Sequence, residues 1–467
     1  MPRLALRQPE CQTAGSRRTD AAAGRRAGRR DNERVDQEAF AELLGEEGQA
    51  LLSTLSSERY EPGRELTVAT RLRRTHRPVL VSAAMEQTRL RQRAAAKFPA
   101  EDAARMYFTQ EGLEQSTRSS VAGYRAARFA KFPGVRRVAD LCCGVGGDAI
   151  ALARAGLSVL AVDRDPLTCA VVRANAEALG LGDRIEVRCE DIREAEVDGC
   201  DAVFADPARR GGRGRVFDPE AYSPPLSWAV GAARRVPRAA LKVAPGIPHS
   251  AVPEEAEVEW ISVGGEVKEA VLWFAGGGLR EDEAGTGAGT AVDGADGGDG
   301  VGGADCPAGR PTSGQEARRV RATLLPGPHT LTGRGLPDPP AGPVGRYLYE
   351  PDGAVIRAHL VAEVAERLDG RLIDPTIAYV TADEARWTPY ATGYEITDVL
   401  PFHVKRLRAL LRERSVGVVT VKKRGSAVDP AELRGKLKLS GPHECTVFLT
   451  RVAGSPAMLL GHPLRSG

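Results

Sequence analysis

The sequence lacks any uninterrupted apolar run long enough to span a membrane. Its first residues, MPRLALRQPECQTAGSRR, also lack the apolar stretch that a secretory signal needs. We therefore predict a cytoplasmic protein that does not insert into a membrane.

Paired cysteines and a large excess of charge are also missing. None of the 8 cysteines belongs to a CxxC pair, and the adjacent Cys142 and Cys143 are too close for an ordinary disulfide or a zinc knuckle. We predict reduced, largely buried thiols and no metal site. A formal net charge of +3 is too small to indicate a polyanionic partner, so any argument for nucleic-acid binding depends on local clusters of basic residues.

The chain's 467 residues exceed what one ordinary core uses, and 42% hydrophobic with 27% charged residues is typical of soluble globular domains. Residues 1–34 are rich in arginine and poor in apolar side chains, which predicts a disordered tail. A basic arm that contacts RNA and an over-extended start are the alternatives. Residues 35–130 repeat apolar positions at helical spacing and predict a helical N-terminal subdomain. Residues 276–316, rich in Gly, Ala and Asp, predict a disordered linker, and residues 317–467 predict a second, smaller α/β domain.

Short apolar segments alternate with helical patterns between residues 131 and 275, which is typical of a parallel sheet covered by helices on both faces. The last two segments are separated only by GGEV and predict a hairpin. We therefore expect a mostly parallel sheet with one reversed edge strand. The predicted strands are VADLCC, SVLAVD, IEVRCE, AVFADP, AALKVA, EVEWIS and EAVLWF.

A glycine-rich stretch, DLCCGVGGD, follows the first predicted strand and starts the next helix. Gly144 and Gly146 lack Cβ atoms, so backbone amides can approach a ligand at the carboxyl edge of the sheet. The next strand ends at Asp163, 19 residues after Gly144, where a carboxylate can accept both hydroxyl protons of an adenosine ribose. Asp191, after the third strand, is placed to meet the adenine amine.

This spacing alone does not distinguish a nicotinamide dinucleotide from S-adenosylmethionine. Asp140, just before the loop, would repel a pyrophosphate and attract the α-ammonium of a methionine moiety, which favours S-adenosylmethionine. We assign Cys142, Asp148 and Asp165 to the same cofactor site, with Cys142 as a packing residue of the loop. The alternative for Asp140 and Asp148 is that they cap the turn and the helix.

Polar side chains also precede the helix that leads into the first strand. Gln115 and Thr117 lie in FTQEGLEQST, from which they can reach the carboxylate of the methionine moiety. Ordinary helix capping by this segment is the alternative.

These motifs resemble those of class I methyltransferases: DLCCGVGGD is similar to their first motif, AVDRDP to their second and AVFADPARR to their fourth. The Rossmann-like core is similar to the trimethylguanosine synthase group, including the hairpin EVEWISVGGEVKEAVLWF. With FTQEGLEQST, DPARR, PFHVKRLR and VKKRG in matching order, the chain resembles bacterial methyltransferases that carry a C-terminal THUMP-like domain. The resemblance implies an S-adenosylmethionine-dependent enzyme and RNA as its partner.

The fourth predicted strand ends in DPARR, at the edge where we expect the cofactor. Base-amine methyltransferases carry an acidic or amide residue followed by Pro-Pro-aromatic. The acidic or amide residue accepts the amine hydrogens, and the aromatic ring stacks on the base. Asp206 and Pro207 match this pattern and Arg209 does not, and we predict these three as catalytic residues acting on a base nitrogen. The missing aromatic can come from the segment that follows, which offers Phe217, Tyr222 and Trp228.

Basic residues beside the acceptor motif and in the C-terminal domain suit RNA contacts. Arg210 and Arg213 follow the acceptor motif, where a solvated loop is the alternative. Lys422, Lys423 and Arg424 follow an apolar strand, and the resemblance to THUMP domains implies that this surface docks structured RNA. Two further alternatives stay open: a small-molecule or protein acceptor, and a non-catalytic RNA-binding protein with a retained methyltransferase scaffold.

Overall fold

The computed structural model describes residues 36–57, 63, 65–207, 210–211, 214–215, 218–275 and 319–464, with only the backbone described at 210–211 and 214–215. The predicted tail at 1–34 and linker at 276–316 lie outside the described residues. The chain divides into two compact units between Cys200 and Asp201.

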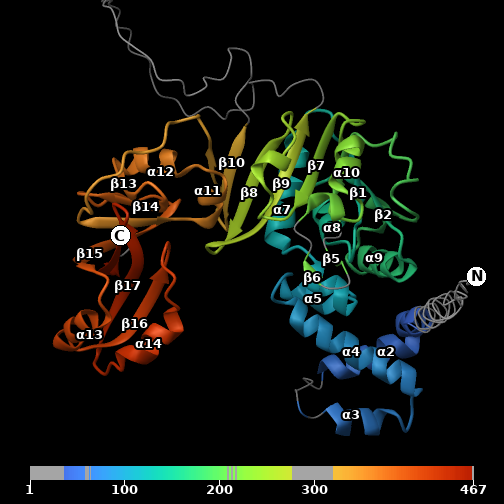
Figure 1. The fold of residues 1–467 in the computed structure, drawn as a ribbon. Helices are drawn as coiled ribbons and strands as arrows, with labels where there is room; N and C mark the ends of the chain where they lie inside the picture. Colours follow the sequence, from blue (N-terminus) through green and yellow to red (C-terminus); the bar gives the residue numbers. More distant parts are fainter. Residues whose placement is uncertain are drawn as a thin grey trace, which may run out of the picture. The chain divides into compact units, whose positions relative to one another are not determined.

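Helices form the N-terminal part of the first unit, as the apolar spacing predicted (Figure 1). The longest, α4, begins at Pro78, whose fixed φ and missing N–H suit the first helical turn. It buries one apolar face that includes Val81 and Ala84. The helices are α2 (Glu46–Ser57), α3 (Glu65–Leu72), α4 (Pro78–Ala94), α5 (Ala100–Arg105), α6 (Gln110–Gln115) and α7 (Ser119–Lys131).

Three parallel strands follow in the first unit, in the order β1-β2-β3. Leu141 pairs in register with Val162, so the glycine-rich loop after β1 and the end of β2 lie at the same edge. Helices α8 and α9 connect the strands. The bounds are β1 (Arg137–Leu141), α8 (Gly147–Arg154), β2 (Ser158–Asp163), α9 (Pro166–Ala178), the 3₁₀ turn η1 (Gly182–Arg184) and β3 (Ile185–Cys189).

The second unit contains two larger sheets, and the first of these has six of its strands, in the order β11-β10-β8-β9-β7-β4. Its elements are β4 (Ala202–Ala205), α10 (Leu226–Ala233), β7 (Arg238–Val243), β8 (Glu257–Val263), β9 (Glu266–Ala275), β10 (Val320–Leu325) and β11 (His329–Thr332), with the two-residue pair β5 (Arg210–Gly211) and β6 (Gly214–Arg215) and the 3₁₀ turns η2 (Pro219–Ala221) and η3 (His249–Ala251).

The expectation of one reversed strand at the sheet edge was wrong in its position. Strand β9 is antiparallel to both neighbours, as the predicted hairpin requires, but it lies between β7 and β8. Strand β10 then pairs in parallel with β8 and carries β11 as a hairpin partner. Strands β10 and β11 fall within the range 317–467 that we assigned to the second domain. Their backbone hydrogen bonds nevertheless extend the sheet of β4, β7, β8 and β9.

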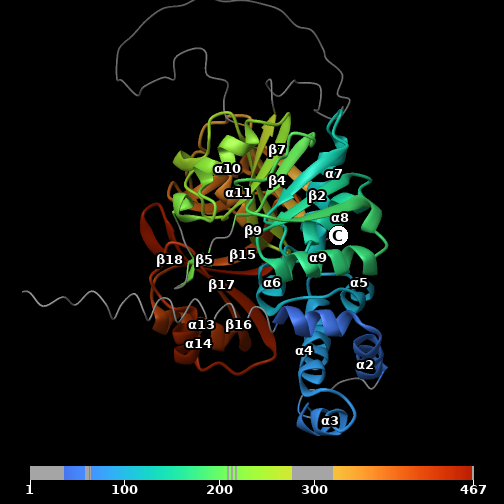
Figure 2. The same cartoon turned by 90° about the vertical axis from the view of Figure 1, so that its right-hand side faces the viewer.

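A second sheet of seven strands follows in the same unit, in the order β13-β14-β12-β15-β18-β17-β16. Its core includes Tyr379, Phe448 and Leu459. Figure 2 shows α13 and α14 beside β16. The elements are β12 (Tyr347–Pro351), α11 (Gly353–Arg357), α12 (Val361–Leu368), β13 (Arg371–Asp374), β14 (Ile377–Ala382), β15 (Ala391–Pro401), α13 (Val404–Glu413), β16 (Val416–Lys423), α14 (Pro430–Leu437), β17 (His443–Val452) and β18 (Ser455–Pro463).

Candidate functional site

The loop after β1 has a backbone that favours glycine at two positions. Gly144 has φ +55° and Gly146 has φ +82°, in the left-handed region where a Cβ atom is unfavourable. Cys142, with φ +62°, occupies the same region with a side chain. The amides of Cys142 and Cys143 both donate to the carbonyl of Val162, at 3.0 and 3.2 Å, so the end of β2 fixes the start of the loop.

Asp163, the last residue of β2, lies against this loop. Its Oδ2 accepts a hydrogen bond from the amide of Gly144 at 3.3 Å, and its Oδ1 accepts one from the amide of Asp165 at 3.0 Å. Burial raises the pKa of the Asp163 carboxyl, while these amide donors act in the opposite direction. The structure therefore brings Asp163 and Gly144 together, two of the residues that the sequence predicts at a cofactor.

Asp140 is the second acid beside the loop and is almost fully buried within β1. Its charge and that of Asp163 add to the effect of burial in raising the pKa of the Cys143 thiol well above its ordinary value. Cys143 therefore stays protonated near neutral pH and is a packing residue rather than a nucleophile.

Asp148 lies in the first turn of α8 and forms an ion pair with a residue that the sequence analysis missed. Arg125 of α7 donates to its carboxylate, with Nε and Oδ1 3.2 Å apart. The Arg125 side chain is only 2% exposed, and its Nη2 also donates to the hydroxyl of Thr117 at 3.3 Å. Asp148 and Thr117 are thus joined through one buried guanidinium. The only sequence signal is an arginine on the apolar stripe of α7.

The other predicted cofactor residues have local partners. Gln115 is exposed and donates to Glu111 at 2.7 Å. Asp165 caps α9 by accepting from the amide of Thr168 at 2.8 Å. The guanidinium of Arg193 contacts Asp191 and holds the pKa of that carboxyl well below its usual range.

Asn175 of α9 is a further buried polar residue that the sequence analysis did not single out. Its side-chain amide bonds both the amide and the carbonyl of Tyr107, at 2.6 and 3.0 Å, and donates to the carbonyl of Val145 at 2.9 Å. It therefore ties the glycine-rich loop to the segment before α6. A polar residue among the apolar positions of α9 was the available signal.

These residues fit an adenosine-containing cofactor. A Cβ atom built on Gly144 would meet no other atom within 4 Å, so there is open space above this glycine. A carboxylate at the end of β2, a short distance from that space, is the group that accepts ribose hydroxyl protons in sheet-edge nucleotide sites.

In the second unit, Asp206 follows β4 and contacts a lysine that the sequence analysis also missed. Lys242 of β7 donates to its Oδ2 at 2.6 Å, and the two side chains are 6% and 25% exposed for Lys242 and Asp206. Pro207, the other matching residue of the acceptor motif, is buried. A lysine inside the apolar run AALKVA was the visible signal for an internal ion pair.

Several predicted acceptor-side residues lie outside what the structure describes. Arg209 and Arg213 are outside the described residues, and of Arg210 only the backbone is described, in β5. Of the three aromatic candidates, Phe217 lies outside the described residues, Tyr222 is buried and Trp228 is half-buried.

Two of the three basic residues at the end of β16 contact one acid. Lys422 and Arg424 both form ion pairs with Glu350 of β12, with Arg424 Nη2 and Glu350 Oε1 3.6 Å apart. Lys422 Nζ also lies 5.3 Å from the centre of the Tyr394 ring. Lys423 is exposed. Strands β12 and β16 have three strands between them, about 19 Å in a flat sheet, so their side chains meet only because the sheet curls.

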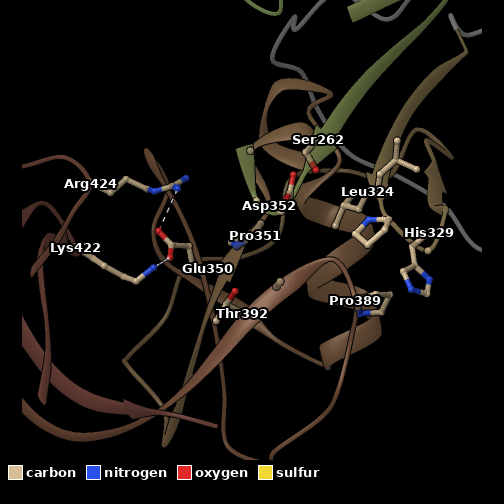
Figure 3. Close-up of a pocket in the computed structure, with 17 residues that line it drawn as sticks. Ser262, Leu324, His329, Glu350, Pro351, Asp352, Pro389, Thr392, Lys422 and Arg424 are labelled. Carbon is tan, nitrogen blue, oxygen red and sulfur yellow. Dashed lines mark hydrogen bonds and ion pairs between the residues drawn. The ribbon is translucent and has the colours of Figure 1, made fainter. Parts of the chain in front are cut away.

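A cavity of about 750 Å³ opens beside this cluster (Figure 3). Glu350 lies between Lys422 and Arg424 on one side, whereas His329 and Pro389 line the other. No predicted cofactor residue lines it. Across the described ranges, no group of three or more His, Cys, Asp or Glu side chains is arranged to hold a metal ion. No described helix is long and apolar enough to cross a membrane.

Family models match three parts of the chain. Residues 135–216 match the RNA cap guanine-N2 methyltransferase family, which covers the glycine-rich loop and the acceptor motif. Residues 391–463 match the THUMP domain-like family, in the second sheet. Residues 36–94, in the N-terminal helices, match a domain family of unknown function.

A solved structure and curated relatives agree with these matches. A crystal structure from Porphyromonas gingivalis W83, assigned to the methyltransferases, superposes with a TM-score of 0.66 at 21% identity, over 87% of this chain and all of that one, and shows the same fold. An uncharacterized RNA methyltransferase from Parasynechococcus marenigrum is 32% identical over 91 residues, 19% of this chain and 20% of that protein.

An uncharacterized S-adenosylmethionine-dependent methyltransferase from Mycobacterium tuberculosis is 33% identical over 379 residues, 79% of this chain and 93% of that protein. The cofactor predicted from the acids around the glycine-rich loop is thereby confirmed. The chain has a Rossmann-like methyltransferase core and a THUMP-like region, and it belongs to the family of S-adenosylmethionine-dependent methyltransferases.

Proposed function

We propose that this methyltransferase acts on RNA and transfers the methyl group to a base nitrogen, with the exocyclic amine of guanine as the first candidate. The observation that carries the proposal is Asp206, followed by Pro207, at the carboxyl end of β4. The match of this region to the RNA cap guanine-N2 methyltransferases favours guanine among the bases.

On the cofactor side, we assign the adenosine ribose to Asp163 and the methionine end to the loop at Asp140 and Gly144. The raised pKa of Asp163 and the burial of Asp140 fit carboxylates that a bound cation and ribose hydroxyls would stabilise. The cofactor supplies an electrophilic methyl group on a sulfonium.

On the acceptor side, Asp206 orients the amine. The nitrogen lone pair forms the new N–C bond while the C–S bond breaks and its electron pair stays on sulfur, which leaves a neutral thioether. The nitrogen becomes positively charged and loses a proton to Asp206 or through it to water. Methyl transfer is an in-line displacement, so alignment of the amine supplies much of the rate and no strong base is needed.

RNA docking is assigned to the THUMP-like region. Lys423 is exposed at the end of β16, next to the cluster of Lys422, Arg424 and Glu350. Lysine and arginine contacts to phosphates are independent of base sequence. They would hold the RNA while Asp206 contacts the acceptor amine.

The test is transfer of label from tritiated S-adenosylmethionine to total cellular RNA, followed by digestion to nucleosides and chromatography. We expect label in a methylated base, and N2-methylguanosine is the first nucleoside to compare. Asp206→Ala should lower the rate at least about 100-fold, with unchanged cofactor affinity in titration calorimetry. Asp163→Ala should weaken cofactor binding itself. Label only in protein or in small molecules would reject RNA as the acceptor.

A further inference from the structure

Lys242 is a buried charged residue, the last but one of strand β7. Its neighbours Leu241 and Val243 are fully buried, and the lysine side chain itself is 6% exposed. Placing an ammonium group there costs several kcal/mol of desolvation unless an anion lies beside it. The anion is the carboxylate of Asp206, 2.6 Å from Nζ.

The register of β4 and β7 places Asp206 beside Lys242. Ala205, the last residue of β4, pairs in parallel with Leu241 of β7, so Asp206 and Lys242 each follow the same rung of the ladder. The contact therefore depends on two neighbouring strands rather than on loop conformation, which gives the Asp206 side chain a rigid support.

The two oxygens of Asp206 have different surroundings. Oδ2 accepts from Lys242, whereas Oδ1 makes no hydrogen bond within the described part of the chain. The Asp206 side chain is 25% exposed, so a ligand can reach it. An amine hydrogen would thus meet Oδ1 of a carboxylate whose rotation is already fixed through Oδ2.

A second buried acid lies on the same face of the sheet. Lys242 pairs in register with Val271 of β9, and Glu269 is two residues from Val271, on the same side of the pleat and diagonal to Lys242. Glu269 is 2% exposed. An acidic residue therefore lies on either side of Lys242 in strand order, Asp206 after β4 and Glu269 in β9.

We infer that Lys242 is a positioning residue for methyl transfer, which holds Asp206 through Oδ2 so that Oδ1 is aimed at the acceptor amine. This inference rests on the proposed role of Asp206, but it does not depend on whether the amine belongs to RNA. It makes Lys242 a determinant of the chemical step and not of cofactor affinity.

The test compares Lys242→Met with a matched control, Lys268→Met. Lys268 is also a strand lysine paired with an acid, Glu266, but that pair is at the exposed end of the β8–β9 hairpin. We expect Lys242→Met to lower kcat about 100-fold while KM and cofactor Kd change by no more than about twofold. Lys242→Arg should recover part of kcat, and Lys268→Met should match the wild type.

A double-mutant cycle with Asp206→Asn separates positioning from a structural role. If Lys242 acts through Asp206, adding Lys242→Met to Asp206→Asn should lower kcat by no more than about threefold. Melting temperatures of all variants report folding. The double variant remains usable if Lys242→Met alone unfolds, because it removes both charges of the Lys242–Asp206 pair and leaves no unpaired Asp206 carboxylate. A kcat of Lys242→Met within twofold of the wild type, or full additivity in the cycle, would overturn the inference.

The acceptor is supplied as a whole-cell extract with tritiated cofactor, fractionated after reaction into RNA, protein and small molecules. Label in RNA supports the proposed function. Label in another fraction rejects RNA as acceptor, and the same variants are then compared on that fraction. If the wild type labels no fraction although calorimetry detects cofactor binding, both the proposed function and the role of Lys242 are rejected.

Discussion

Asp163 should make cofactor binding depend on pH. Burial raises the pKa of its carboxyl above the ordinary aspartate value of about 3.9. Only the ionised form accepts both ribose hydroxyl protons, so affinity should fall as the pH is lowered, and the fall should begin at a higher pH than for an exposed aspartate. Titration calorimetry with S-adenosylmethionine between about pH 4.5 and 8 measures this profile.

The variant Asp163→Asn is the control for that profile. It should bind the cofactor weakly at every pH and give a flat curve. Because an acid with a raised pKa binds its proton more tightly in the folded state, stability falls as the pH rises from the unfolded to the folded pKa. Asp163→Asn should therefore raise the melting temperature at neutral pH. A wild-type affinity that stays constant down to about pH 4.5 would contradict the assignment.

Arg125 should be a large contributor to stability because its ion pair with Asp148 is buried. Removing one partner of such a pair leaves an isolated charge, and Arg125→Met should cost about 3–5 kcal/mol of unfolding free energy. The matched control is Arg137→Met, since Arg137 also pairs with an acid, Glu186, but both side chains are exposed, at 38% and 48%. Urea denaturation should give about 1 kcal/mol or less for that control. Equal losses would show that burial of the pair does not set its energy.

At the scale of elements, Asp165 and Asp429 form a matched pair of helix caps. Each precedes a proline at the first helical position, and each accepts hydrogen bonds from amides of the first turn, in α9 and α14. Asp165→Ala and Asp429→Ala should each lower stability by about 1 kcal/mol in chemical denaturation. If Asp165 is only a cap, neither variant changes cofactor affinity. A specific loss in Asp165→Ala would make it a ligand residue, as its position after the second strand predicts.

Local sequence patterns predicted the strands of the core well, but they did not predict which strands pair with one another or which side chains form ion pairs. All seven predicted strands of the core occur, because alternation and burial of apolar residues are local properties. The internal position of β9 could not be predicted, because it depends on β10 pairing with β8. The two strands are separated by 56 residues, 264–319, and no local pattern in β10 indicates that pairing. Lys242 and Arg125 were missed for the same reason, because their partners Asp206 and Asp148 are 36 and 23 residues away.

At the scale of the whole molecule, the curl of the second sheet also depends on contacts between distant segments, and local sequence patterns do not predict it. The sequence predicts basic residues at the end of β16. It does not predict that Glu350 of β12 forms ion pairs with two of them, Lys422 and Arg424. That contact arises from the accumulated twist of five neighbouring strands, which no local pattern encodes. Of the three RNA contacts predicted at the end of β16, Lys423 is exposed, whereas Lys422 and Arg424 are half-buried.

Replacing Glu350 should therefore strengthen RNA binding. Glu350→Gln removes the internal counter-ion of Lys422 and Arg424, so both cations become available to phosphates. Affinity for a structured RNA should rise, and the slope of log affinity against log salt should become steeper by roughly 1 to 2.

The matched control is Glu395→Gln, which removes the same charge from the same sheet but releases only the exposed Arg346. Filter binding at several salt concentrations should leave its slope close to that of the wild type, so a steeper slope in Glu350→Gln alone would place the phosphates at Lys422 and Arg424. Because the two variants have identical net charge, a general electrostatic effect would change both equally. Equal slopes for the two variants would therefore remove Lys422 and Arg424 from the proposed RNA surface and leave Lys423 as its remaining predicted contact.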